Sequence, residues 1–144
     1  MTDTDPTTAV AAFWVQKAHE ALASAGSELG AGRISFAVNR LYYACFYAAS
    51  AHFLANHVRF TKHSGVRAAV HRDLVKPGVL TVDEGRLYDR LFVDRQEADY
   101  LELTEFEPAA VQKDLEASQR LVLKLCGLTS VGPGPGRARS DRKP

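Results

Sequence analysis

The sequence of 144 residues is poor in the features that support disulfide, zinc or membrane chemistry. It has two cysteines, Cys45 and Cys126, and neither belongs to a CxxC pair. Both lie in apolar, helix-like segments, where a free cysteine usually acts as a small buried hydrophobic residue. We therefore expect a reduced, cytoplasmic protein. No stretch reaches the ~18 consecutive apolar residues of a membrane span, and the acidic, polar residues 1–8 do not resemble a signal peptide, so we expect no membrane segment.

Motifs for the common nucleotide and metal chemistries are also missing. The chain contains no GxxxxGKS, GxxxxGKT, GxGxxG or GxSxG segment, so P-loop hydrolysis, dinucleotide redox chemistry and serine hydrolysis have no support. The histidines never form an HExxH pair, and we expect neither a metal site nor a cofactor. The body of the chain also lacks a short basic helix of the kind that reads DNA. The five histidines are His19, His52, His57, His63 and His71.

The net charge of +1 is unevenly distributed. Residues 129–144 carry four basic residues and one acidic residue, a charge of +3, which leaves −2 on residues 1–128. This last segment is rich in Gly and Pro and has too few apolar residues to fold alone, so we expect a disordered tail. Its basic end either adds electrostatic affinity for nucleic acid or is simply solvated. Residues 1–5 are also expected to be disordered.

What the chain does have is apolar residues at helical spacing throughout residues 6–128. The pattern predicts an amphipathic helix that begins at Pro6, is broken at Gly26 and at Gly30 to Gly32, and buries Val10, Trp14, Ala18 and Ala21. Residues 33–57 are apolar almost all round, which predicts a central helix. Because no strand-like alternation occurs, we expect one all-α domain, a bundle of four to five helices.

Capping patterns mark the remaining helices. Ser64 has the position of an N-cap for a short third helix that ends at residues 76–78. Residues 81–84 and 104–107 both have the capping-box pattern and are expected to open two further helices. Gly127 is the natural residue to follow the end of the last one.

Polar side chains interrupt the apolar stripe of the helix at residues 87–100. Leu87 and Leu91 lie one above the other at i, i+4, and the same row continues with Arg95 and Asp99. One interpretation is an ion pair that closes the end of the helix. The other is a phosphate or RNA site, since a guanidinium is rarely placed on a buried face without a partner.

Two more polar residues extend this hypothesis. Arg40 lies one turn from Tyr43 inside the apolar second helix, where it pairs either with an acid of a neighbouring helix or with phosphate. His63 precedes a helix N-terminus, where backbone N–H groups favour anions, or else it is a surface residue of a capping segment. Together with Arg95, Asp99 and Tyr100, these residues are expected to form one cluster across three helices.

At these positions the chain resembles the HEPN-domain family, and in particular its small bacterial and archaeal subgroup formerly called UPF0332. The resemblance covers about residues 10–126, and its blocks occur in the family's order. The blocks are NRLYYACFYAA at residues 39–49, KHSGV at 62–66, VKPG at 75–78 and RQEADY at 95–100.

The resemblance implies an up-and-down helical bundle, commonly a homodimer, often paired with a minimal nucleotidyltransferase as a toxin and antitoxin or in defence. Active members are metal-independent ribonucleases, in which an arginine and a histidine four to six residues later stabilise the phosphorane and move protons. Arg95 matches the arginine, but the corresponding histidine is replaced by Tyr100. Tyrosine, with a reference pKa near ~10, is a weak general base at neutral pH. Tyr47 and the order Thr61–Lys62 also depart from the family pattern.

Two function classes therefore follow from the sequence. The first is an RNA-directed toxin, in which Arg95, His63, Asp99 and Tyr100 form the catalytic group. Arg40, Lys62 and Tyr43 would then hold RNA or its phosphates. The second is a non-catalytic HEPN module that binds a nucleotidyltransferase partner or a nucleotide. If such a partner modifies this protein, the Tyr100 hydroxyl is the first candidate.

Overall fold

The computed structural model describes residues 6–100 and 105–129, and within these ranges the chain is helical with no strand. This confirms the all-α fold class. Residues 1–5 and 130–144, assigned above to disordered ends, lie outside the described ranges. The elements are α1 (Pro6–Gly30), α2 (Ile34–Ala55), α3 (His63–Ala69), the π-helix η1 (Val70–Val75), α4 (Val82–Tyr100) and α5 (Pro108–Thr129).

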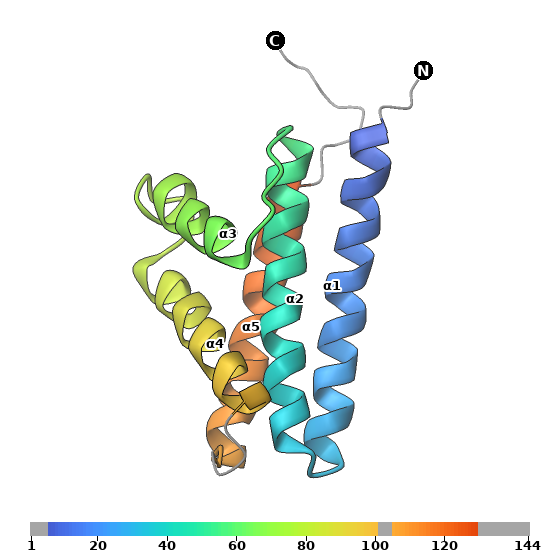
Figure 1. Cartoon of the computed structure of the whole chain (residues 1–144), viewed down its shortest axis with the longest axis vertical. Helices are drawn as coiled ribbons and strands as arrows, with labels where there is room; N and C mark the ends of the chain where they lie inside the picture. Colours follow the sequence, from blue (N-terminus) through green and yellow to red (C-terminus); the bar gives the residue numbers. More distant parts are fainter. Residues whose placement is uncertain (1–5, 101–104, 130–144) are drawn as a thin grey trace.

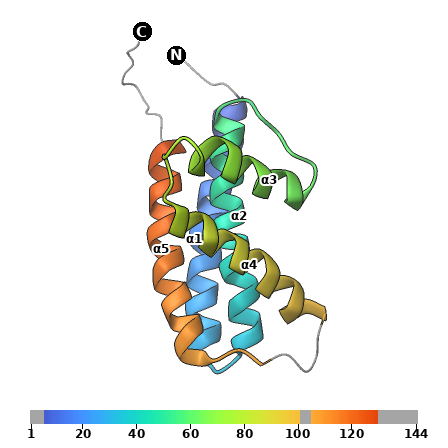
Figure 2. The same ribbon diagram turned by 90° about the vertical axis from the view of Figure 1, so that its left-hand side faces the viewer.

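Three long helices run along the length of the molecule, and the other elements cross them. α1, α2 and α5 lie side by side along the longest axis (Figure 1). α3 and α4 lie obliquely across one side of these three helices, as the view turned by 90° shows (Figure 2). α2 contacts α1, α3, α4 and α5, so it occupies the centre of the bundle. The prediction of a central second helix is confirmed.

The composition of α2 explains its position. Its buried residues occur on nearly every side of the helix, as expected for a helix that is covered by several neighbours. Many of them are alanines, and the buried face of α1 consists of Ala11, Ala18, Ala21 and Ala25. Small side chains on both helices permit a close approach of the backbones. The buried residues of α2 are Ala37, Val38, Leu41, Tyr42, Ala44, Cys45, Ala48, Ala49, Ala51, Phe53 and Leu54.

The buried face of α1 differs in part from the prediction. Ala18 and Ala21 are buried as expected, but Val10 is 36% exposed and Trp14 is only half-buried. Ala11 takes the buried position instead. The face is centred on the small residues because these fit closest to α2, and the larger side chains are left at its edge.

Two glycines that the sequence marked as helix breaks or ends, Gly26 and Gly127, lie inside helices in the structure. α1 continues through Gly26 and ends at Gly30, so the predicted break at Gly26 is wrong and the one at Gly30 to Gly32 is confirmed. α5 continues through Gly127 to Thr129, so its predicted end is wrong. A glycine costs a helix interior only ~1 kcal/mol, which the packing of a long apolar face outweighs. Thr129, assigned above to the tail, donates a hydrogen bond to the Leu125 carbonyl at 2.9 Å.

The third helix begins two residues earlier than predicted. Lys62 is its N-cap and His63 its first residue, while the Ser64 side chain makes no capping bond. The helix then widens into the π-helix η1 and stops in the turn where Gly78 has a φ of 87°. Glycine is favoured there because a positive φ is costly for other residues.

The predicted capping box at residues 81–84 is present. The Thr81 N–H donates to Glu84 Oε1 at 2.7 Å, and the Glu84 N–H donates to Thr81 Oγ1 at 3.0 Å. Glu84 also accepts a bond from Lys124 at 2.9 Å, which joins α4 to α5. The second predicted box includes Thr104, which lies outside the described residues. Among the helices of the described ranges, none has the length and apolar character needed to cross a bilayer.

Candidate functional site

A cluster of aromatic rings at the junction of α2, α3 and α4 forms the floor of the candidate site. Tyr42 is at its centre and is fully buried. Its ring lies within 6.1 Å, centroid to centroid, of five other rings from these three helices. The neighbours are Tyr43, Phe46, His63, Tyr88 and Phe92.

Arg95 is held over this floor. Its guanidinium carbon lies 4.9 Å from the Tyr42 ring centroid and 5.9 Å from that of Phe92, a cation–π arrangement. The side chain is only 12% exposed. Its ion pair with Asp99 measures 3.7 Å, which is longer than the ~2.8 Å of a charge-assisted hydrogen bond. The predicted pair therefore exists, but the contact is loose.

Asp99 has a second partner. The Asn39 side-chain amide donates to Asp99 Oδ1 at 3.0 Å and connects the start of α2 to the end of α4. Nothing else among the described residues hydrogen-bonds to the Arg95 side chain, and its Nε is buried without a partner. A nearly buried guanidinium with unused donors calls for an explanation, because buried polar atoms in proteins are usually satisfied.

His63 approaches the same floor from α3. Its ring lies flat on Phe46, with centroids 4.3 Å apart and planes 5° apart. Its Nδ1 is 2.8 Å from the Tyr42 hydroxyl oxygen. Burial, and to a lesser extent the positive charge of Arg95, lowers the pKa of His63 below its usual 6.5. The imidazole is therefore mostly neutral at pH 7, and its Nε2 makes no hydrogen bond to any described residue.

The Tyr42 hydroxyl keeps its proton under the same conditions. Burial raises the pKa of Tyr42 to about 12, although the nearby Arg95 acts in the opposite direction. The hydroxyl can donate to His63 Nδ1 or accept from it, depending on the tautomer of the imidazole. Tyr42 thus positions His63 and cannot itself serve as a base at neutral pH.

The remaining predicted residues are placed as follows. Arg40 lies over the Tyr43 ring at 5.4 Å, which brings both to the edge of the cluster. No carboxylate of the described ranges is within ion-pair distance of Arg40, and its buried Nε lacks a partner. Lys62 is exposed at the N-cap of α3, and its side chain makes no bond to the described cluster. Tyr100 ends α4, but its side chain lies outside the described residues.

The structure brings Arg95, His63, Asp99, Tyr43 and Arg40 together across α2, α3 and α4, as the sequence predicted. It adds three residues that sequence reasoning gave no role in the site: Tyr42, Phe46 and Asn39. Tyr42 and Phe46 form an i, i+4 pair on α2, and this spacing was the signal that could have found them. Asn39 gave no signal of its own, because its partner Asp99 is 60 residues away.

A second polar cluster lies beside the first. Asp89 Oδ1 accepts from Arg67 Nε at 2.7 Å and lies 2.8 Å from His71 Nε2. The Arg67 guanidinium also lies 4.6 Å from the Phe92 ring centroid. Burial alone would raise the pKa of Asp89, but the hydrogen bonds from Arg67 and His71 outweigh it and lower the pKa. No group of three or more His, Cys, Asp or Glu side chains in residues 6–100 and 105–129 is arranged to hold a metal ion.

Comparison with known proteins assigns most of the chain to one family. Residues 11–127 match the sequence profile of the family described as HEPN domain. The chain belongs to the HEPN family. The fold and the family assignment inferred from the sequence are thereby confirmed, and the blocks that contain Arg40, His63 and Arg95 all lie inside the matched range.

Two curated relatives are similar over much of the chain. A protein of Thermotoga maritima named "UPF0332 protein" is 45% identical over 100 residues, which are 69% of this chain and 76% of that protein. A protein of Methanocaldococcus jannaschii named "Putative toxin MJ0142" is 30% identical over 86 residues, which are 60% of this chain and 58% of that protein. The first name assigns no activity, and the second names a toxin.

Proposed function

We propose that this HEPN protein acts on RNA, with Arg95 as the phosphate-binding residue and His63 as the proton-transfer residue of a metal-independent ribonuclease. One observation carries the proposal. Arg95 is a nearly buried cation that makes no hydrogen bond within the described structure and only a loose ion pair with Asp99. A guanidinium presents five donors in a planar fork that suits phosphate oxygens, and a ligand of this kind would use the donors that the protein leaves free.

The aromatic floor favours an anion at this point. The Tyr42 ring holds the guanidinium by its face, which requires no hydrogen bond and leaves the edges of the fork for a ligand. The loose contact with Asp99 neutralises Arg95 only in part, and Asn39 shares the same carboxylate. A phosphate that approaches Arg95 therefore displaces no strong internal partner.

His63 supplies a base of suitable strength. Its lowered pKa keeps the imidazole mostly neutral at pH 7, and Nε2 makes no hydrogen bond to a described residue. In the proposed step, Nε2 takes the proton of a ribose 2′-hydroxyl while that oxygen attacks the adjacent phosphorus. Arg95 stabilises the extra negative charge on the phosphorane. The P–O5′ bond breaks, the proton passes from His63 to the departing 5′-oxygen, and a 2′,3′-cyclic phosphate and a 5′-hydroxyl remain.

The test is a cleavage assay on total RNA and tRNA in the presence of EDTA. We compare the wild-type protein with Arg95→Ala, Arg95→Lys and His63→Ala. Arg86→Ala is the charge-matched control, since Arg86 is 74% exposed and its contact with Asp83 is 3.6 Å. We expect cyclic-phosphate ends from the wild type and the control, and a rate at least ~100-fold lower in Arg95→Ala and His63→Ala. Cleavage that persists in both of these variants would overturn the proposal.

A second candidate function is a non-catalytic HEPN module that binds a nucleotidyltransferase. The motif position that would hold histidine is Tyr100, and no histidine follows His71, which favours this alternative. If the folded wild type does not cut RNA, this second function is preferred. The homodimer, the nucleotidyltransferase partner and the cytoplasmic location stay predictions. Sedimentation at several protein concentrations tests the dimer, and co-purification with a minimal nucleotidyltransferase tests the pairing.

A further inference from the structure

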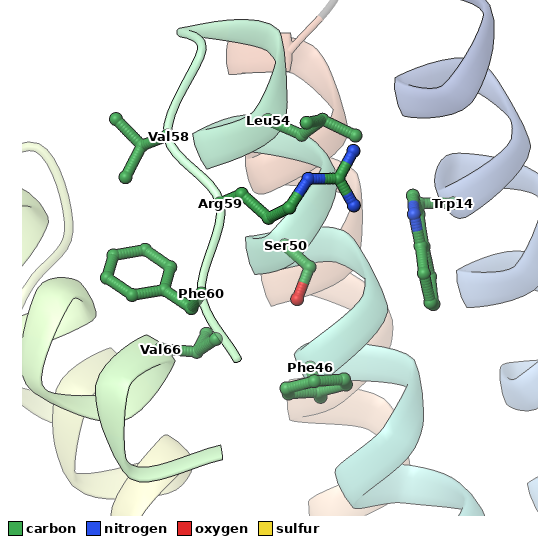
Figure 3. A pocket seen from close by; sticks show the side chains of 8 residues that line it. All are labelled: Trp14, Phe46, Ser50, Leu54, Val58, Arg59, Phe60 and Val66. Atoms are coloured by element: carbon green, nitrogen blue, oxygen red, sulfur yellow. The ribbon is translucent and has the colours of Figure 1, made fainter. Parts of the chain in front are cut away.

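Phe46 also lines a small pocket. It has a volume of about 130 Å³ and lies between α1, α2, α3 and the segment that joins α2 to α3 (Figure 3). Three aromatic side chains line it, one from each of α1, α2 and the joining segment: Trp14, Phe46 and Phe60. The pocket is thus mainly a site for a flat apolar group.

Two polar side chains at the pocket, Ser50 and Arg59, indicate what kind of ligand it suits. The Ser50 hydroxyl points into it from α2, and the Arg59 side chain reaches across its mouth toward Trp14 (Figure 3). Neither side chain has a hydrogen-bond or ion-pair partner in the described ranges. An exposed arginine at the mouth of an apolar pocket is suited to the anionic part of a ligand whose ring lies inside.

The pocket adjoins the proposed RNA site. Phe46 lines the pocket, and its ring also stacks on His63 at 4.3 Å. A second connection runs through Tyr47, whose ring is 5.2 Å from Trp14 and 5.7 Å from Tyr43. A ligand in the pocket would therefore lie one aromatic ring away from the imidazole that the proposed mechanism uses.

We propose that this pocket binds an unstacked pyrimidine base of single-stranded RNA. The inference rests on the proposed function and names the nucleotide that would neighbour the phosphate held by Arg95. Trp14 and Phe46 supply ring surfaces for stacking, as aromatic side chains do in proteins that bind single-stranded RNA. Ser50 hydrogen-bonds the edge of the base, and Arg59 contacts the phosphate of the same nucleotide.

The size of the pocket favours one ring over two. Cavities of roughly 150 Å³ hold a single benzene ring, and this pocket measures about 130 Å³. A pyrimidine matches this volume more closely than the two fused rings of a purine do. An apolar side chain of a partner protein would also fill the pocket, but it would give Arg59 no anion to bind.

Trp14 allows a direct test, because it is the single tryptophan of the chain. Its fluorescence is followed while the full-length protein is titrated with decamers of 2′-O-methyl uridine, cytidine or adenosine, which lack the 2′-hydroxyl needed for cleavage. We expect saturable quenching by the two pyrimidine decamers and binding at least ~5-fold weaker for the adenosine decamer. Equal quenching by all three decamers would overturn the assignment to pyrimidines.

Variants distinguish the pocket from the proposed catalytic site. Ser50→Leu fills the pocket, and Ser50→Ala removes only the hydroxyl, so at least one folded variant is available if the larger side chain disturbs the bundle. We expect weaker quenching in both and in Arg59→Ala, and no change in the Arg86→Ala control. RNA cleavage that is normal in a protein whose Trp14 is never quenched would refute the pocket and leave the proposed function intact. Quenching of Trp14 by the pyrimidine decamers in a protein that does not cut RNA would support the pocket and refute the proposed ribonuclease. Quenching only by an added partner protein would overturn the proposal and assign the pocket to protein binding.

Discussion

The hydroxyl oxygen of Tyr42 lies 2.8 Å from Nδ1 of His63, although the two residues are 21 positions apart in the chain. The bond joins the central helix α2 to the first residue of α3. It fixes which nitrogen of the imidazole faces the protein and which one is free for a ligand. The proton-transfer role proposed for His63 therefore depends on a residue that the sequence marks only as part of the core.

Tyr42→Phe should remove this bond and preserve the ring that supports Arg95. We expect the free energy of unfolding to fall by about 1 kcal/mol, the usual contribution of one hydrogen bond, and RNA cleavage to fall because His63 loses its orientation. Chemical denaturation and the cleavage assay measure the two effects. Tyr43→Phe is the matched control for stability, since the Tyr43 hydroxyl makes no hydrogen bond within the described structure, and a comparable fall in its free energy of unfolding would contradict this account.

The pKa of His63 should lie below 6.5 in the folded protein, because burial and the charge of Arg95 disfavour the imidazolium. NMR titration of the ring protons measures it directly. In Arg95→Ala the pKa should move upward, toward the reference value. A His63 pKa at or above 6.5 in the wild type would remove the physical basis for a neutral base at pH 7.

The same shift makes stability depend on pH. His63 and the more deeply buried His52 both have lowered pKa values, so below pH 6.5 the unfolded chain binds protons more readily than the folded one. Their contribution to the free energy of unfolding is complete above pH 6.5 and is lost as the pH falls through the folded pKa values. Denaturation curves recorded between pH 7.5 and 5 should show this fall in the free energy of unfolding. In the double variant His52→Gln, His63→Gln, the free energy of unfolding should depend less on pH.

Two glycines in helices should respond oppositely to alanine. A Cβ at Gly26 would meet no atom within 4 Å, so Gly26→Ala should stabilise the protein by about 0.5–1 kcal/mol. A Cβ at Gly85 would lie 2.9 Å from Val75 Cγ2 and 3.1 Å from His71 Cε1, so Gly85→Ala should destabilise it by about 1–3 kcal/mol. Thermal melts of both variants measure the two effects, and equal changes in melting temperature would contradict the close approach of Gly85 to Val75 and His71.

Asp89→Asn should test the cluster that joins α3 and η1 to α4. The substitution keeps the shape of the side chain but removes the charge that faces Arg67 and His71. Because the three side chains are about one third exposed, we expect a loss of only about 1 kcal/mol. Asp83→Asn is the control, since Asp83 is 91% exposed and its contact with Arg86 is 3.6 Å, and urea denaturation should detect no change there.

The sequence alone determined the helical class, the central position of α2 and several members of the candidate site. These features depend on the spacing of residues within one helix, which a helix of 3.6 residues per turn converts into a face. The i, i+4 relation of Arg95 and Asp99 and the capping box at residues 81–84 are of this kind, and both are present. The HEPN family was recognisable for a related reason, because its motif residues occur in short contiguous blocks.

Only the tertiary structure decided what surrounds those residues. The contacts of Tyr42 with His63 and of Asn39 with Asp99 depend on how α3 and α4 cross α2, and periodicity within a single helix does not specify the crossing. α1 also continues through Gly26, where the sequence favoured a helix break. Of the two interpretations that the sequence left open for Arg95, the packing gave only a loose ion pair and a buried Nε without a partner. A local signal is worth about 1 kcal/mol, whereas the burial of a long helix face is worth several times more, so where the two conflicted the interhelical packing prevailed.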